Sequence, residues 1–273
     1  MKTTAIPLFL LCLAAAGLAS AQPVPCPPCY DALGAYQSPI EFNAAKGCVP
    51  SLLSSAMCPA FVPPHFATDI LRFKVTYADV GTVEQNIKFY NAAPAGAGIV
   101  FQGVTYYLIE FHFHSPSEHT FTGPTRVFHM ELHMVFRSTP DSHDKLPGVV
   151  IGVPIAVTRE STPFDRFLDK LLSSNLANGA PIEVSSGLFT SCLHYNNHWN
   201  FPPSFVYPGS LTTEPYAEGV TWIVINGHVA QTAQISQATL NKFLALQING
   251  SRIGHSRPVQ KIYSRPIVTV TPP

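Results

Sequence analysis

Charged side chains are scarce in this sequence, and neither sign is in excess. The 273 residues include 16 lysines and arginines against 16 aspartates and glutamates, so charged residues make up only 12%. Soluble domains usually have about twice that share. A chain without a basic excess has little with which to neutralise phosphates, so these numbers argue against a nucleic-acid-binding protein.

The sequence also lacks internal repeats, blocks of like charge and any linker long enough to divide it. Hydrophobic residues reach 46% and aromatic residues 11%, enough to form a core, which argues against a disordered chain. The 26 prolines are about twice the usual frequency. Because proline disrupts helix interiors and suits turns and strand edges, this composition favours strands joined by turns over a helix bundle.

The single long apolar run lies at the N-terminus. Lys2 precedes an apolar stretch over residues 5–18, and Ala19-Ser20-Ala21 forms a small-residue cleavage site. The stretch is short for a membrane anchor and no later segment reaches that length, so we expect no membrane span. We expect residues 1–21 to be a signal peptide cleaved near Ala21, which leaves a secreted, extracellular, periplasmic or cell-surface protein. In a eukaryotic secretory route, the only N-glycosylation sequon, Asn249-Gly250-Ser251, is then available.

Export changes the interpretation of the cysteines. Cys26, Cys29, Cys48, Cys58 and Cys192 follow the cleavage site, and most should be bridged in an oxidising compartment. Cys48 and Cys58 are close enough to close a short loop, whereas Cys192 has either Cys26 or Cys29 as its partner. Because the number is odd, one thiol stays free or links two chains in a disulfide-linked dimer.

The remainder of the chain is typical of one mainly β domain, residues 37–273, after an irregular N-terminal arm at residues 22–36. Short β-rich runs alternate there with turn signals. The expected strands cover residues 73–77, 99–101, 106–114, 129–137, 149–157, 206–207 and 221–225. Two helices are expected in addition, one from Ser161 or Thr162 to about Asn175 with Pro163 in its first turn, and one over residues 236–246.

The informative segment is the run EFHFHSPSEHT at residues 110–120. On a strand, side chains two residues apart share a face. His112 and His114 therefore point the same way, together with Glu110, while the phenylalanines between them face the other side. A second histidine-containing strand, HMELHMVF, follows at residues 129–136.

On the second strand, His133 shares a face with Glu131 and Val135. The connection from His114 to His133 is long enough for the two strands to return antiparallel as neighbours, which brings three imidazoles together. Three histidines with one open position are a catalytic zinc arrangement, in which the metal lowers the pKa of bound water towards neutrality. The sequence therefore predicts a Zn²⁺ site.

Carboxylates next to these histidines favour a metal site over an ordinary solvated sheet face. A metal-binding histidine donates its other ring N–H to an acceptor. Glu110 and Glu131 each stand two residues from a candidate ligand on the same face. Both are predicted to support the ligands in this way.

Several motifs then occur in an order that resembles the α-class carbonic anhydrases, and the likeness is closer to plant, algal and bacterial members. The resemblance runs from Gln37-Ser-Pro-Ile40 to Arg257-Pro-x-Gln260 and implies a single domain on a central, largely antiparallel twisted sheet with a few short surface helices. Its strongest motifs are Phe111-His-Phe-His114, Ser117-Glu-His-Thr120, Glu131-Leu-His133, Tyr207-Pro-Gly-Ser-Leu-Thr-Thr213 and Val220-Thr-Trp-Ile-Val224.

The resemblance implies reversible hydration of carbon dioxide to bicarbonate and a proton through zinc-bound hydroxide, and inhibition by sulfonamide-type compounds. His112, His114 and His133 match the zinc ligands of the family. Thr212 matches its gatekeeping threonine and Glu118 the carboxylate that orients that hydroxyl. The positions that match the substrate pocket are Val135, Val150, Leu211, Thr213, Val220 and Trp222.

The sequence departs from the family pattern in three places. Glu110 stands where glutamine is common, and a carboxylate there should make His112 a stronger donor and raise the pKa of the metal-bound water. No histidine occurs between His65 and His112, so the usual proton shuttle is missing, and its replacement (His65, His194 or His198) is unknown. The usual segment before Gln37 is replaced, and Tyr216 ends an altered Thr-Thr-Pro-Pro run.

Two functions from different classes follow. The leading one is a secreted zinc lyase, a carbonate dehydratase. The alternative is a non-catalytic carbonic-anhydrase-like protein used for binding or as a mineral scaffold. Relatives of that kind typically lose metal histidines, whereas this chain retains all three together with Thr212 and Glu118, so the complete site favours catalysis.

Overall fold

A computed structural model of the chain describes residues 35–43, 61–123, 125–140, 148–193, 202–230, 233–263 and 265–270. All of them belong to the unit formed by residues 32–273. The expected signal peptide, most of the expected N-terminal arm and four of the five cysteines after the cleavage site lie outside the described residues. Export, cleavage near Ala21 and the pairing of Cys48 with Cys58 therefore stay predictions.

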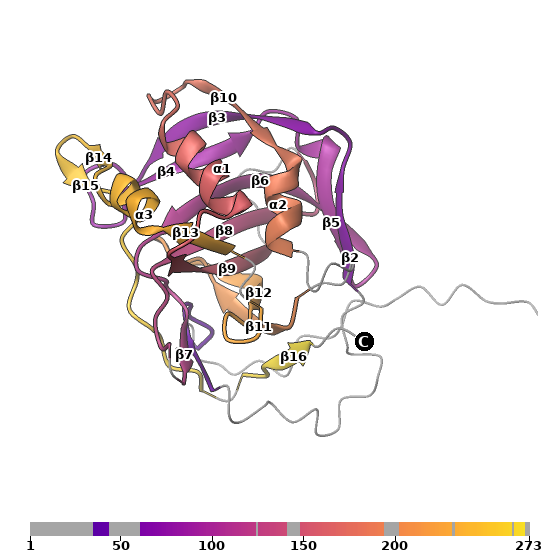
Figure 1. Cartoon of the computed structure of the whole chain (residues 1–273). Helices are drawn as coiled ribbons and strands as arrows, with labels where there is room; N and C mark the ends of the chain where they lie inside the picture. Colours follow the sequence, from indigo (N-terminus) through magenta and orange to yellow (C-terminus); the bar gives the residue numbers. More distant parts are fainter. Residues whose placement is uncertain are drawn as a thin grey trace, which may run out of the picture. The chain divides into compact units, whose positions relative to one another are not determined.

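The described chain is mainly β, as the sequence predicts (Figure 1). Its helices are α1 (Pro163–Leu172), α2 (Ser186–Leu193), α3 (Gln237–Leu244) and the short 3-10 helix η2 (Pro94–Gly96). Its strands are β1 (Glu41–Asn43), β2 (Phe61–Phe66), β3 (Ile70–Ala78), β4 (Asn86–Asn91), β5 (Ala97–Phe101), β6 (Val104–His114), β7 (Thr120–Thr122), β8 (Met130–Arg137), β9 (Gly148–Thr158), β10 (Pro181–Ser185), β11 (Ser204–Ser210), β12 (Glu218–Ile225), β13 (Ala233–Ser236), β14 (Gln247–Ile248), β15 (Ser251–Arg252) and β16 (Val268–Val270). Each of the expected strands is present.

Twelve of these strands form one sheet, whose main path runs β10-β3-β4-β6-β8-β9-β12-β11-β16. Most neighbours are antiparallel, as expected, but β9 runs parallel to both β12 and β13. The sheet is therefore mixed rather than strictly antiparallel. Between β9 and β12 the chain passes through α1, β10, α2 and β11. This connection is long enough to allow the two strands to pair in parallel.

The two faces of the sheet bury two separate apolar clusters, because side chains alternate along β6 and β8. Phe111 and Phe113 of β6 lie in the larger cluster with Leu132 and Met134 of β8. Val135, one residue further along β8, lies in the smaller cluster. This alternation confirms the faces predicted for both strands.

The three α-helices cover the face that carries the larger cluster, and Figure 1 shows α1 and α2 in front of the central strands. The expected starts of α1 and α3 are confirmed. The Thr162 hydroxyl accepts a hydrogen bond from Asp165 N at 3.0 Å, and the Ser236 hydroxyl accepts one from Thr239 N at 3.2 Å. No helix within the described part of the chain is long and apolar enough to cross a membrane.

Helix α2 was not predicted from the sequence, and its residues explain why. The segment SGLFTSCL contains glycine, serine and threonine, which have low helix propensity. It is stabilised instead by tertiary burial, since Leu188, Phe189, Cys192 and Leu193 all lie in the larger cluster.

Cys192 corrects one expectation about the disulfides. Its thiol is free and fully buried in α2, at 0% exposure, so it forms no bridge to Cys26 or Cys29. Burial also raises the pKa of the thiol, which keeps it protonated and unreactive. A disulfide-linked dimer through Cys192 is excluded by this burial.

We predict that Cys192 in the native protein resists alkylation. Iodoacetamide should leave the peptide that contains it unmodified until denaturant is added, and should then modify it without any reductant. Mass spectrometry of the digested protein measures both states, and a sample reduced before denaturation is the control. A Cys192 that reacts only after reduction would show that it is bridged.

Candidate metal centre

Two rows of paired residues cross the sheet on the face opposite the helices. In the first row, His112 of β6 lies opposite His133 of β8, which lies opposite Gly152 of β9. In the second row, Glu110 of β6 lies opposite Val135 of β8. Paired residues of a ladder project from the same face, so the sheet register alone brings these side chains together.

The three predicted metal ligands converge and are almost fully buried. His112, His114 and His133 are 6%, 2% and 1% exposed. Their ring centroids are 4.8 to 5.1 Å apart. One ring nitrogen from each lies within 4.8 Å of the others, close enough to hold one metal ion. The predicted histidine cluster is therefore present in the fold.

Each of these rings has its second nitrogen held by an oxygen. Nδ1 of His112 lies 2.9 Å from a Glu110 carboxylate oxygen, and Nε2 of His133 lies 3.0 Å from Glu131. Nδ1 of His114 lies 2.7 Å from the backbone carbonyl of His255. The two predicted carboxylate supports are thus in place. The third is a main-chain oxygen, which no side-chain pattern could have indicated.

The pKa shifts of His112 and Glu110 favour a neutral ring beside an ionised carboxylate. Burial lowers the pKa of His112 to about 3, although Glu110 raises it, so the ring is neutral near pH 7. Burial alone would raise the pKa of Glu110, but the charge and hydrogen bond of His112, together with Lys88 and His133, lower it. A neutral imidazole beside an ionised carboxylate has a lone pair available for a cation.

Glu131 is the centre of a buried network that the sequence analysis missed. Its Oε1 lies 3.0 Å from His133 and 2.7 Å from Nδ1 of His119, and its Oε2 accepts a hydrogen bond from His119 N at 2.8 Å. Nε2 of His119 lies 2.6 Å from the Tyr207 hydroxyl, which donates to Ser38 Oγ at 3.0 Å. His119 stands inside the Ser117-Glu-His-Thr120 motif, so that motif was the available signal.

Burial alone would raise the pKa of the Glu131 carboxyl. The charge and hydrogen bond of His119, together with the hydrogen bond and charge of His133, instead lower it well below its ordinary value. Glu131 is therefore an ionised carboxylate fixed between two histidines. Its position fixes the orientation of the His133 ring.

Glu118 lies beside the cluster with one oxygen held and the other free. Its Oε1 accepts a hydrogen bond from Arg257 N at 2.8 Å and lies 3.6 Å from Nδ1 of His114. Its Oε2 is buried without a hydrogen-bond partner and lies 3.9 Å from Nε2 of His133. Thr212 is buried in the loop after β11, but it makes no hydrogen bond to that oxygen. The predicted contact between Glu118 and Thr212 is therefore not formed in this structure.

The predicted pocket positions, apart from one, belong to the smaller apolar cluster. Val135 pairs with Val150 of β9, and Val150 pairs with Trp222 of β12. The Trp222 ring centroid lies 4.8 Å from that of His133, so the apolar wall adjoins the metal cluster. The members of this wall are Val135, Val150, Leu211, Val220 and Trp222. Thr213 is half-buried in the loop after β11.

The candidate proton shuttles cannot be placed. His194 and His198 lie outside the described residues, as does the side chain of His65. Their roles stay open predictions.

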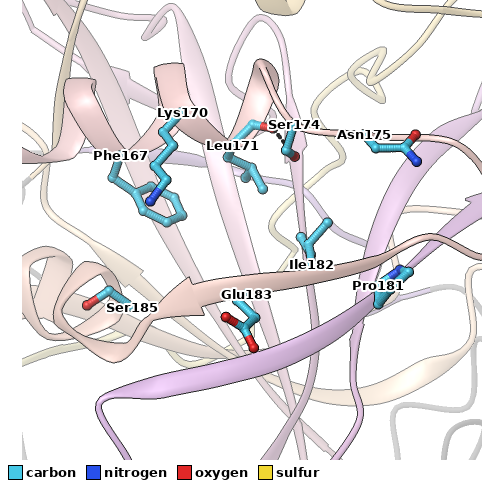
Figure 2. Close-up of a pocket in the computed structure, with 9 residues that line it drawn as sticks. All are labelled: Phe167, Lys170, Leu171, Ser174, Asn175, Pro181, Ile182, Glu183 and Ser185. Carbon is cyan, nitrogen blue, oxygen red and sulfur yellow. Dashed lines mark hydrogen bonds between the residues drawn. The ribbon is translucent and has the colours of Figure 1, made fainter.

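A groove lies between α1 and β10 (Figure 2). This groove has a volume of about 410 Å³. Its lining is Phe167, Lys170, Leu171, Ser174, Asn175, Pro181, Ile182, Glu183 and Ser185. It offers neither imidazole nor thiolate, so it does not compete with the histidine cluster as a zinc site.

The residues of the cluster fit Zn²⁺ on their own chemistry. Glu110, His255 and Glu131 hold the other nitrogens, which leaves Nε2 of His112, Nε2 of His114 and Nδ1 of His133 for a metal. Nε2 of His114 is buried with no other partner. Three imidazole nitrogens without a cysteine are one of the ligand sets found in catalytic zinc sites.

Known proteins that are similar to this chain include carbonic anhydrases. The model of the eukaryotic-type carbonic anhydrase family matches residues 26–271. Carbonic anhydrase of Neisseria gonorrhoeae is 29% identical over 201 residues, which cover 72% of this chain and 69% of the relative. Alpha carbonic anhydrase 7 of Arabidopsis thaliana is 32% identical over 171 residues, which cover 62% of this chain and 56% of the relative.

Among solved structures, the alpha-carbonic anhydrase from Thermovibrio ammonificans with the inhibitor sulfanilamide is similar, with 26% identity and a TM-score of 0.59. The similarity covers 86% of this chain and 87% of that one. The chain spans 41% to 60% of the Arabidopsis thaliana alpha carbonic anhydrases 3, 5, 7 and 8. Because the family model matches almost the whole sequence, this chain belongs to the eukaryotic-type carbonic anhydrase family.

Proposed function

We propose that this protein is a zinc-dependent carbonic anhydrase that reversibly hydrates carbon dioxide to bicarbonate and a proton. The observation that carries the proposal is the convergence of three ring nitrogens within 4.8 Å, each on a histidine whose other nitrogen is already held. Zn²⁺ bound there would act as a Lewis acid that lowers the pKa of water, a case established for carbonic anhydrases.

The apolar wall would receive the substrate. Carbon dioxide has no net charge and no hydrogen-bond donor, so it needs a small apolar surface rather than a charged one. Val135, Val150 and Trp222 provide that surface beside the His133 ring. The same side chains exclude water from the side where the reaction would occur.

Glu118 and Thr212 would orient the reacting groups. Arg257 already occupies one oxygen of Glu118, which leaves Oε2 as the acceptor for the Thr212 hydroxyl. A hydroxyl that donates to a carboxylate has only its lone pairs left to offer, so it selects a neighbour that donates to it. The Thr212 backbone N–H is a donor for a substrate oxygen as negative charge develops on it.

The proposal is tested by stopped-flow hydration of carbon dioxide with zinc-loaded protein. We expect activity that a chelator removes, that added Zn²⁺ restores and that acetazolamide inhibits. His112→Ala should lower kcat/KM by at least about a thousandfold because it removes a metal ligand. His129→Gln is the matched control, since His129 is exposed and lies outside the cluster. Protein with one bound Zn²⁺ per chain and no activity would favour the binding or scaffold function instead.

The Glu110 carboxylate gives a second prediction. As a stronger acceptor than glutamine, it would make His112 a more electron-rich ligand, and Zn²⁺ held there would then lower the pKa of water less. Glu110→Gln should therefore shift the pH profile of kcat/KM downward. Glu183→Gln, an exposed glutamate paired with Arg72, is the control. An unmoved profile in Glu110→Gln would contradict this role.

Gly152 gives a third prediction. Because glycine has no side chain, the Glu131 carboxylate can occupy the space beside it. A Cβ added at Gly152 would lie 2.6 Å from Glu131 Oε1, so one of the two must move. Gly152→Ala should weaken Zn²⁺ binding by about ten- to a hundredfold, the range found when partners of metal ligands are lost. Competition with a chelator measures this. Gly96→Ala, where the added Cβ meets Ala67 at 3.6 Å, should bind Zn²⁺ as the wild type does.

A further inference from the structure

The loop over residues 211–217, between β11 and β12, carries both Thr212 and Thr213. It is closed by hydrogen bonds from Leu211 N to Ala217 O at 2.9 Å and from Tyr216 N to Thr213 O at 2.8 Å. Tyr216 has a φ of 56°, in the left-handed region that a bulky residue seldom adopts. Contacts from outside the loop are therefore needed to hold this conformation.

Glu84 supplies two of those contacts from the turn between β3 and β4. Its Oε2 accepts a hydrogen bond from the backbone N–H of Glu214 at 2.7 Å. Its Oε1 accepts a hydrogen bond from the Tyr216 hydroxyl. One carboxylate thus joins two residues of the loop to a turn that is about 130 positions earlier in the chain.

The Tyr216 ring is held on a second side by Arg257. The guanidinium carbon of Arg257 lies 3.7 Å from the ring centroid, a cation–π contact. The same residue donates its backbone N–H to Glu118 Oε1 at 2.8 Å. A third segment contributes Gln37, whose side-chain amide donates to the Tyr216 carbonyl at 3.2 Å and whose Oε1 accepts from Arg257 at 3.0 Å.

These contacts connect the loop that carries Thr212 to the carboxylate that Thr212 is proposed to use. We propose that Glu84 and Tyr216 are positioning residues for carbon dioxide hydration, because they hold the loop of residues 211–217 in place relative to Glu118. This inference rests on the proposed function. Neither side chain belongs to the two apolar clusters, so their contacts act on the loop rather than on the core.

The test separates the hydroxyl, the carboxylate and the ring. Tyr216→Phe removes only the hydroxyl and keeps the ring on Arg257, and it should lower kcat/KM by about fivefold. Glu84→Ala removes both acceptors and should lower kcat/KM by about tenfold or more. Glu84→Gln retains a weaker acceptor, so its kcat/KM should lie between those of the wild type and Glu84→Ala. The double variant Tyr216→Phe/Glu84→Ala should be no worse than Glu84→Ala, because the bond between the two is already lost.

Two controls exclude a general structural effect. Tyr263→Phe changes an exposed tyrosine that also has positive φ, and should leave kcat/KM unchanged. The Zn²⁺ affinity of Tyr216→Phe should equal that of the wild type, since the metal ligands are untouched, and its urea midpoint should fall by no more than the loss of one hydrogen bond explains. Amide hydrogen exchange in residues 211–217 should be faster in Tyr216→Phe and Glu84→Ala than in the wild type.

The outcomes are distinguishable from those of the proposed function. Zinc-loaded wild type without activity would refute the function before any substitution is made, and the positioning role with it. An active wild type with unchanged kcat/KM in Tyr216→Phe and Glu84→Ala would overturn only the positioning role. Equal loss of kcat/KM and of Zn²⁺ affinity would also overturn it, because the effect would then act through the metal.

Discussion

The hydrogen-bonded register between β6 and β8 is the constraint on which the rest of the site depends. It places His112 directly opposite His133 and Glu110 opposite Val135. A slip of one residue would turn one strand's histidine to the other face, among the phenylalanines that pack against the helices. The apolar residues that alternate with the histidines therefore do more than fill the core. By burying Phe111, Phe113, Leu132 and Met134 on one side, they specify the metal ligands on the other.

The second constraint is the cost of buried charge. Three carboxylates, Glu110, Glu118 and Glu131, are buried around the histidines, and buried carboxylates destabilise a fold unless they are paired. Glu131 meets this demand most completely, because it makes three such contacts, two to His119 and one to His133. Glu118 meets it least, because its Oε2 has no partner. The same small cluster thus contains Glu131, which holds a metal ligand rigidly, and Glu118, which has an oxygen free to accept a further hydrogen bond.

Strand alternation made the metal ligands and their carboxylate supports predictable. The period of two in the residues from Glu110 to His114 and from Glu131 to Val135 is visible in the sequence itself. The helix starts at Thr162 and Ser236 were predictable for a similar reason, since capping chemistry is local. What these residues share is that their role depends on near neighbours in the chain.

The other contacts of the site could not be predicted, because they join residues far apart in the sequence or use main-chain groups that every residue has. The His119–Tyr207 contact joins residues 88 positions apart, and Tyr207–Ser38 spans 169. The carbonyl of His255 and the amide of Arg257 are main-chain groups that any residue would present. Helix α2 forms against propensity because the core accepts its apolar side chains, and the parallel pairing of β9 follows from a long connection rather than from a pattern.

The site also depends on main-chain contacts from residues that lie far along the chain from β6. His114 and Glu118 receive partners that are 141 and 139 positions later in the sequence. Pairing of β6 with β8 alone would bring the histidines together without the oxygen that holds Nδ1 of His114. A high proportion of contacts with such sequence separation is typical of slowly folding β-rich proteins. The metal site is therefore complete only when residues 255–257 have docked beside β6.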